Sequence, residues 1–189
     1  MPSPHDSPVT QKTFRTLLQA LSRPGEIYSL SHVGEGQSWF PVLETLLDHE
    51  VSFAVIGPNN DAFARMVADL TRCPVTTVAK ADFIIVTQGG SRGRILEAQR
   101  GTLEYPDQGA TIIYLVESLS REGRDGLRVK LQGPGVKAEM SARITGLHGE
   151  ELLYLRQINQ DFPLGVDCFL IDRTGRVMGI PRSAQLEVE

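Results

Sequence analysis

Residues 51–72 have the sequence VSFAVIGPNNDAFARMVADLTR, in which an apolar run is followed by a turn and a periodic segment. The run from Val51 to Ile56 predicts a buried strand, and Gly57-Pro58-Asn59 supplies a turn and a helix cap. The next segment predicts a helix from about Asp61 to Arg72. Its apolar residues recur at the spacing of one helix face: Phe63, Met66, Val67 and Leu70. Such a strand-turn-helix unit is typical of α/β proteins.

The same alternation continues, more loosely, in the next 30 residues. Val75 to Val78 and Asp82 to Thr87 are strand candidates, Gly89-Gly90 interrupts the chain, and Arg92 to Arg100 predicts a weak helix. Alternating strands and helices favour a sheet that is mostly parallel or mixed, with helices packed on it.

Upstream of this region, the spacing of Phe14, Leu17, Leu18 and Leu21 predicts a helix from Thr10 to Ser22. The helix should end at Arg23-Pro24-Gly25, because proline lacks an N–H donor and glycine frees the backbone. A short extended piece from Glu26 to Leu30 and a helix from Pro41 to Leu47 should follow.

The second half of the chain has more strand character. Ala110 to Val116 predicts a central strand, and two segments alternate apolar and polar residues with period 2, as strands with one wet face do. The further predicted elements are a helix from Glu150 to Asn159, a strand from Val166 to Ile171, and a returning strand from Val177 to Ile180; the alternating segments are 127–132 and 136–144. We expect a single α/β domain over residues 1–189, with a flexible N-terminus at 1–9.

Composition indicates an ordinary globular protein. The chain has 189 residues, 41% hydrophobic and 22% charged, with a net charge of −4, which does not favour nucleic acid. Fifteen of its nineteen basic residues are arginines, a bias that suits carboxylate or phosphate recognition and that codon composition explains equally well. No apolar stretch approaches the length of a membrane span, and the start has no apolar signal region. Cys73 and Cys168 are far apart in sequence, as in reduced proteins, so we expect a cytoplasmic protein.

The sequence lacks the residue patterns of zinc proteases, α/β-hydrolases and iron–sulfur proteins. The four histidines show no H-E-x-x-H spacing, no G-x-S-x-G occurs, and two distant cysteines cannot hold an iron–sulfur cluster. We therefore predict no catalytic, metal-binding or cofactor-binding residue.

The remaining site candidates are loops. Gly89, Arg92 and Arg94 lie between a strand and a helix, where backbone N–H groups could hold a phosphate, although a flexible connection explains the same residues. Arg23 and Arg182 could add to an anion site or contact a partner. Asp167 enters a strand and could be catalytic or, more simply, a hydrogen-bonded structural residue.

Five segments taken together resemble the PhnH family, whose members belong to the bacterial carbon–phosphorus lyase core complex. The resemblance extends from near residue 14 to 186 in the same order and with similar spacing. The segments are FR at 14–15 with ALSRPG at 20–25; LLD at 46–48 with VSF at 51–53; GTLEYP at 101–106 with GAT at 109–111; LQGPG at 131–135; and FPLGVD at 162–167 with IPRS at 180–183. Val136 stands where isoleucine is expected, which is a conservative departure.

The resemblance implies a protein of phosphonate catabolism that assembles with the carbon–phosphorus lyase subunits G, I and J, and possibly L. In that family the complex displaces adenine from ATP with an alkylphosphonate, giving ribose 1-phosphonate 5-triphosphate. A later radical step, on the J component, breaks the carbon–phosphorus bond, and the PhnH component contains neither reaction centre. The resemblance also implies a homodimer when isolated, and an α/β fold similar to pyridoxal-phosphate-dependent transferases without the cofactor.

Pyridoxal phosphate would need a lysine at the sheet edge. The lysines are Lys12, Lys80, Lys130 and Lys137, and only Lys80, near Asp82, could lie in a suitable crevice. We therefore expect no cofactor.

These observations predict an accessory protein that docks onto catalytic neighbours. Trp39, Phe40 and Tyr105 are candidate interface anchors, because aromatic residues are enriched at interfaces, although each could instead close the core. The alternative is a stand-alone nucleotide- or phosphonate-binding enzyme that uses the arginine- and glycine-lined loop as an anion site.

Overall fold

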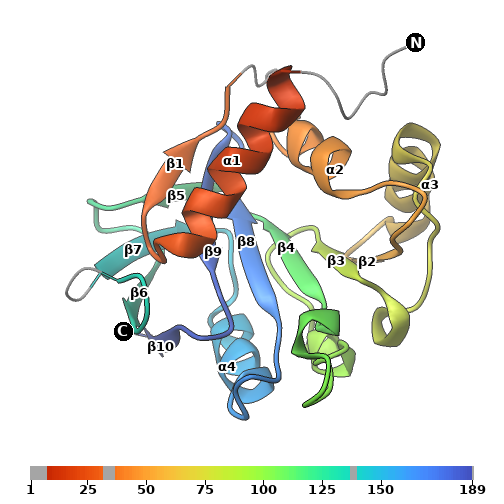
Figure 1. Cartoon of the computed structure of the whole chain (residues 1–189). Coiled ribbons are helices and arrows are strands. Elements are labelled where there is room, and N and C mark those ends of the chain that lie inside the picture. The colour runs from red at the N-terminus through yellow and green to blue at the C-terminus, as the bar shows by residue number, and fades with distance from the viewer. Residues whose placement is uncertain (1–7, 32–36, 137–139, 189) are drawn as a thin grey trace.

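A computed structural model describes residues 8–31, 37–136 and 140–188 (Figure 1). Within these ranges, six strands form a mixed sheet in the order β1-β9-β8-β4-β3-β2. The strands β2, β3, β4 and β8 are parallel, whereas β9 is antiparallel to both β8 and β1. Their bounds are β1 Ile27–Ser29, β2 Phe53–Ile56, β3 Phe83–Val86, β4 Thr111–Leu115, β8 Asp167–Ile171 and β9 Arg176–Ile180.

The register of this sheet sends alternate residues into two cores. Val55, Ile85, Ile113 and Phe169 are paired across β2, β3, β4 and β8, and all four are buried in the same cluster. Three helices cover that face: α1 (Pro8–Ser22), α2 (Phe40–Leu46) and α3 (Asn60–Thr71). Figure 1 shows α1 crossing β9, with α2 and α3 toward the β2 side.

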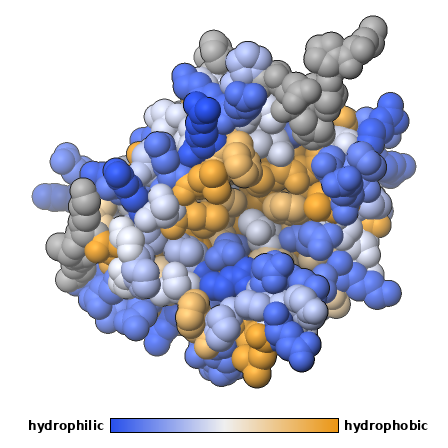
Figure 2. All heavy atoms as spheres, viewed as in Figure 1, coloured by the Kyte–Doolittle hydropathy of each residue, from blue (hydrophilic) through white to orange (hydrophobic). Residues whose placement is uncertain are grey.

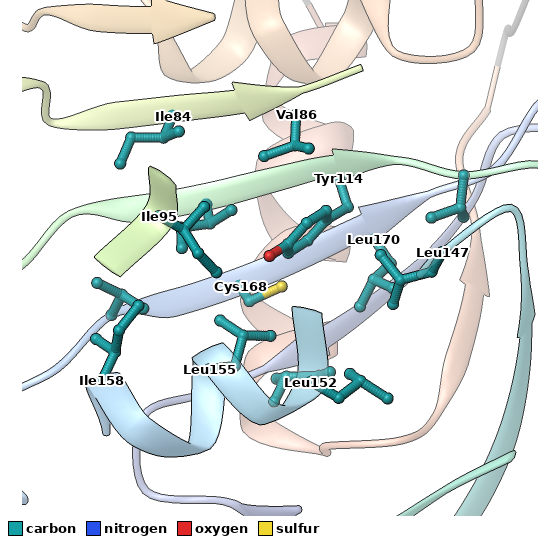
Figure 3. Close-up of a cluster of buried hydrophobic side chains, with 14 of the residues drawn as sticks. Ile84, Val86, Ile95, Tyr114, Leu147, Leu152, Leu155, Ile158, Cys168 and Leu170 are labelled. Atoms are coloured by element: carbon teal, nitrogen blue, oxygen red, sulfur yellow. The ribbon is translucent and has the colours of Figure 1, made fainter. Parts of the chain in front are cut away.

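The other face of the sheet packs against α4 (Gly149–Ile158) and a second, antiparallel sheet. The second sheet has the order β10-β6-β7-β5, with bounds β5 Ser118–Ser120, β6 Leu127–Gln132, β7 Met140–Thr145 and β10 Gln185–Val188. Figure 3 shows Leu152, Leu155 and Ile158 of α4 lying against Tyr114 and Cys168 of the sheet. Both faces of the parallel strands are thus buried, as parallel sheets require.

The predicted α/β class and mixed sheet are confirmed, while several local predictions are wrong. Val75 makes only an isolated bridge to Phe53, so Val75 to Val78 is not a strand of the sheet. The helix predicted from Arg92 to Arg100 is only a short 3-10 turn, Arg94–Glu97, because the backbones of Arg92 and Gly93 are left-handed (φ 54° and 81°).

The sequence does not predict the strands β5 and β10, and the described residues form two sheets where one is expected. Each of these strands has only three or four residues, too few to show a period. At the N-terminus, Pro8 and Val9 already belong to α1, and the rest of the predicted flexible tail lies outside the described residues.

Candidate functional site

Two of the five segments that carry the resemblance meet at Arg182: the one that contains Asp167 and Arg182 itself, and the one that contains Pro106. Its Nη2 and Nε donate to Oδ2 of Asp167 at 2.7 and 3.2 Å, its backbone N–H donates to Oδ1 at 2.9 Å, and its Nη1 donates to the carbonyl of Pro106. The Arg182 side chain is only 13% exposed. Its donors are therefore engaged within the chain, and an external anion would have to displace Asp167.

Glycine turns bring two more segments to the same region. A Cβ on Gly135 would lie 2.3 Å from the carbonyl oxygen of Ser22, and one on Gly133 would lie 3.1 Å from that of Ser183. Gly25 and Gly135 also have positive φ, so side chains at these positions would be strained. Arg23 is exposed beside these turns and pairs only loosely with Glu26, at 3.9 Å. Four of the five resembling segments thus form one strip.

The loops at the amino ends of β4 and β8 expose large apolar side chains next to this strip. Leu103, Phe162 and Tyr105 are 78%, 64% and 55% exposed. The loops are fastened to each other by the ion pair of Arg100 with Asp161 at 2.8 Å. Tyr105 therefore lies on the surface, as a residue that contacts a partner must. Its role as an interface anchor stays a prediction.

The loop from Gly89 to Arg94 is held from inside by a carboxylate of α4. The backbone N–H and hydroxyl of Ser91 both donate to Oε1 of Glu151, at 2.6 and 2.9 Å. Arg92 is exposed, and Arg94 faces Glu97 at 3.9 Å. This loop follows β3 and so lies at the carboxyl ends of the parallel strands. Arg182 follows the antiparallel strand β9 and so lies at their amino ends. The five candidate anion contacts are not brought into one site.

Glu151 is only 1% exposed, and Tyr114 completes its hydrogen bonding through an O–H donated to Oε2 at 2.8 Å. Burial, together with nearby Cys168 and Glu151, raises the pKa of Tyr114 well above its ordinary value, so the hydroxyl keeps its proton. Burial likewise raises the pKa of the Cys168 thiol. This buried group joins α4, β4 and the glycine loop, and neither Tyr114 nor Cys168 reaches solvent.

A cavity of about 770 Å³ lies at the carboxyl ends of β3, β4 and β8. Its lining residues are Ser38, Trp39, Thr87, Gln88, Leu115, Val116, Glu117, Gly146, Leu147, His148, Ile171, Asp172 and Arg173. Ligands of open α/β sheets bind at this edge as a general rule. None of the predicted anion contacts lines the cavity, but the predicted anchor Trp39 does.

Trp39 caps the start of α2 and Phe40 is its first residue; both are partly buried. The indole lies edge-on to Phe63 of α3, with ring centres 5.2 Å apart. Trp39 and Phe40 also line a shallow apolar hollow of about 390 Å³ with Met66 and Leu70. Each aromatic ring therefore packs within the chain and keeps part of its surface exposed, and its role as an interface anchor stays a prediction.

The outer side of α1 exposes two large apolar side chains among polar ones such as Lys12 and Arg15. Phe14 and Leu18, one helical turn apart, are 47% and 51% exposed, while Leu17 and Ala20 are buried beneath the helix. Figure 2 shows apolar side chains gathered over and beside this helix, where the surface is hollowed toward the sheet. We call Phe14 and Leu18 the α1 face.

The lysines within the described residues do not fit a Schiff base at the carboxyl edge. Lys80 precedes β3 and so lies at the amino end of the sheet, where the Asp82 carboxylate accepts from the N–H and hydroxyl of Ser52. Lys12 is exposed on α1, Lys130 lies on β6, and Lys137 lies outside the described residues. Absence of a cofactor stays a prediction.

The described part of the chain was also searched for metal-binding clusters and for membrane-spanning helices. It contains no group of three or more His, Cys, Asp or Glu side chains placed to hold a metal ion. Its helices include none that is both long and apolar enough to cross a membrane.

Sequence reasoning missed two buried acids. Glu151 follows Glu150 at the start of a helix and looks like an ordinary first-turn acid, so only the fold reveals that it points inward. Asp172 begins the turn Asp172-Arg173-Thr174-Gly175, and its position in that turn was the available signal. Its side chain is fully buried and accepts from Leu119, Thr174 and Arg176.

Comparison with known proteins gives a family model and two relatives that match nearly the whole chain. The profile of the family described as "Bacterial phosphonate metabolism protein (PhnH)" matches residues 4–187. HtxG of Stutzerimonas stutzeri, named as a putative C-P lyase subunit protein, is 32% identical over 187 residues, covering 97% of this chain and 88% of its own. The alpha-D-ribose 1-methylphosphonate 5-triphosphate synthase subunit PhnH of Rhizobium meliloti (strain 1021) is 30% identical over 186 residues, covering 95% and 90%.

Proposed function

The chain belongs to the family of bacterial phosphonate metabolism proteins PhnH, and on this basis we propose that it is an accessory subunit of a carbon–phosphorus lyase complex. In this role it holds the catalytic subunits together and supplies no reacting group of its own. The proposal includes subunits G, I and J as partners, possibly L, in a cytoplasmic assembly. In this proposal the complex carries out the step in which an alkylphosphonate displaces adenine from ATP. The fold of this chain is proposed to be similar to that of pyridoxal-phosphate-dependent transferases.

The observation that carries the proposal is the α1 face. Large apolar side chains exposed side by side on a helix are a feature of surfaces that meet other proteins. Phe14 and Leu18 contribute little to the chain's own core, since each leaves about half of its surface in water. Covering them by a partner would bury that area without rearranging the fold, so we assign the docking surface to this face. In the isolated protein, a second copy would cover the same face.

The test is co-expression with subunits G, I and J, followed by affinity capture on this chain. Leu18→Asp should keep the native circular dichroism, should lower the melting temperature no more than Leu153→Asp does, and should recover at least tenfold less of the partner subunits. A carboxylate buried at an apolar interface without a partner is strongly unfavourable, which is the basis of this expectation.

Leu153→Asp is the matched control. Leu153 is 53% exposed on α4, on the opposite face of the sheet, so the same chemical change should leave capture unaffected. Capture by Leu18→Asp at the wild-type level would contradict the α1 face as the docking surface. Turnover of ATP and methylphosphonate by this chain alone would contradict the accessory role and support the stand-alone enzyme.

A further inference from the structure

The cavity at the carboxyl edge of the main sheet has no part in docking through α1. We propose that it binds a purine nucleoside, with the base against Trp39 and its hydrogen-bonding edge toward Gln88. This inference goes beyond the proposed function, because a docking protein needs no ligand. At about 770 Å³ the cavity falls in the size range of small-molecule sites.

Three of the four parallel strands end at this cavity. Thr87 and Gln88 follow β3, Leu115 ends β4, and Ile171 ends β8. Because parallel strands all end at one edge, residues far apart in sequence converge there. The cavity therefore follows from the strand order itself.

Hydrogen bonds between its walls hold the cavity open in a fixed shape. The backbone N–H of His148 donates to the carbonyl of Gly89 at 2.8 Å, which joins the loop after β3 to the start of α4. The Ser38 hydroxyl donates to the carbonyl of Asp172 at 2.5 Å, which fixes the chain next to Trp39. A site whose walls are already joined loses little entropy when a ligand binds.

The lining is suited to a flat, neutral ring with a polar edge. Leu115, Leu147 and Ile171 are apolar, and Trp39 supplies an aromatic ring on which a base can stack. The Gln88 amide carries a donor and an acceptor side by side, the pair that matches N6 and N7 of adenine. At the rim, Arg173 and Glu117 lie 3.5 Å apart and offset each other's charge, so the lining favours a base over a free phosphate.

Gln88 has a backbone conformation that glycine would adopt more easily. Its φ is 82°, in the left-handed region, and its side chain is part of the cavity wall. Backbone strain at a non-glycine residue is held in place by the surrounding structure, and such residues are enriched at ligand sites. In the proposal, the Gln88 side chain hydrogen-bonds the base.

The experiment uses the fact that Trp39 is the chain's single tryptophan, so that intrinsic fluorescence reports directly on the cavity. Adenosine should change this fluorescence with a saturable curve. Gln88→Gly should raise the melting temperature by relieving the strain, yet weaken adenosine binding at least tenfold. Inorganic triphosphate should give no saturable change.

Arg72→Gly is the matched control, because Arg72 also has a left-handed backbone (φ 64°) but lies at the end of α3, outside the cavity lining. It should raise the melting temperature and leave adenosine binding unchanged. The absence of a saturable response up to millimolar adenosine would overturn the proposal, as would wild-type affinity in Gln88→Gly. Leu18→Asp should bind adenosine normally, so the failure of docking and the failure of this site are distinguishable.

Discussion

Asp172 shows how one buried charge is stabilised in this protein. Its carboxylate accepts five hydrogen bonds, from the N–H groups of Leu119, Thr174 and Arg176, the Thr174 hydroxyl and the Arg176 Nε. Burial alone would raise the pKa of Asp172, but these hydrogen bonds outweigh it and lower the pKa below its ordinary value. The residue thereby joins the β8–β9 turn to β5 and shapes one wall of the carboxyl-edge cavity.

We predict that Asp172→Asn lowers the free energy of unfolding by about 2 kcal/mol at pH 7, because an amide cannot accept all five hydrogen bonds and Arg176 loses its counter-charge. The folded-state pKa lies below the unfolded value of about 3.9, so the stabilisation is complete above that value and is lost as the pH falls through the folded-state pKa. Urea unfolding at several pH values should show the wild type and variant converging below about pH 4. An equal difference at pH 7 and pH 3 would contradict this account.

At the scale of elements, the packing of α1 on β9 depends on Gly179. A Cβ at this position would lie 2.6 Å from the backbone carbon and oxygen of Ala20, so the helix backbone rests directly on the strand. The buried Ala20 is also small, which allows the same close approach from the helix side. This contact sets the position of α1, and with it the place of Phe14 and Leu18 on the surface.

We predict that Gly179→Ala destabilises the protein by about 2 kcal/mol, because the added methyl group meets backbone atoms that cannot move aside. The effect is measured by urea unfolding. Gly149→Ala is the control, since a Cβ there would meet only Leu127 Cδ2, at an ordinary contact distance of 3.5 Å. A loss as large in Gly149→Ala as in Gly179→Ala would show that glycine replacement in general, and not the α1 contact, is responsible.

At the scale of the whole molecule, the main sheet separates two cores that share its strands. Cys73 lies in the core under α1–α3, and Cys168 lies in the core under α4; each is 1% exposed. Burial, with the nearby charges of Asp48 and Asp82, raises the pKa of Cys73 to about 12, and burial raises that of Cys168 as well. The native thiols should therefore be unreactive near neutral pH.

We predict that both thiols become reactive in one unfolding transition, because the strands that fill one core fill the other too. The measurement follows thiol labelling in Cys73→Ala and Cys168→Ala during urea unfolding, with Trp39 fluorescence recorded in the same samples. Within each variant, the labelling and fluorescence midpoints should coincide. Labelling of either remaining thiol well before the fluorescence change would indicate that the two cores unfold separately.

The sequence by itself determined the α/β class, the main helices and the central strands, because periodicity and turn residues act within a few positions. It also determined the family, since the resembling segments keep their order and spacing along the chain. It did not yield β5 or β10, which are too short to show a period, nor the left-handed backbone at Arg92 and Gly93 that reduces a predicted helix to a short turn.

Only the tertiary structure decided which side chains meet. Arg182 and Asp167 are 15 positions apart and pair, Ser91 and Glu151 are 60 apart and bond, and Trp39 reaches a cavity built from the ends of three strands. These contacts depend on strand order and on close approaches at glycines, such as Ala20 against Gly179. The physical reason is that long-range contacts are set by how elements pack, and no local pattern carries that information.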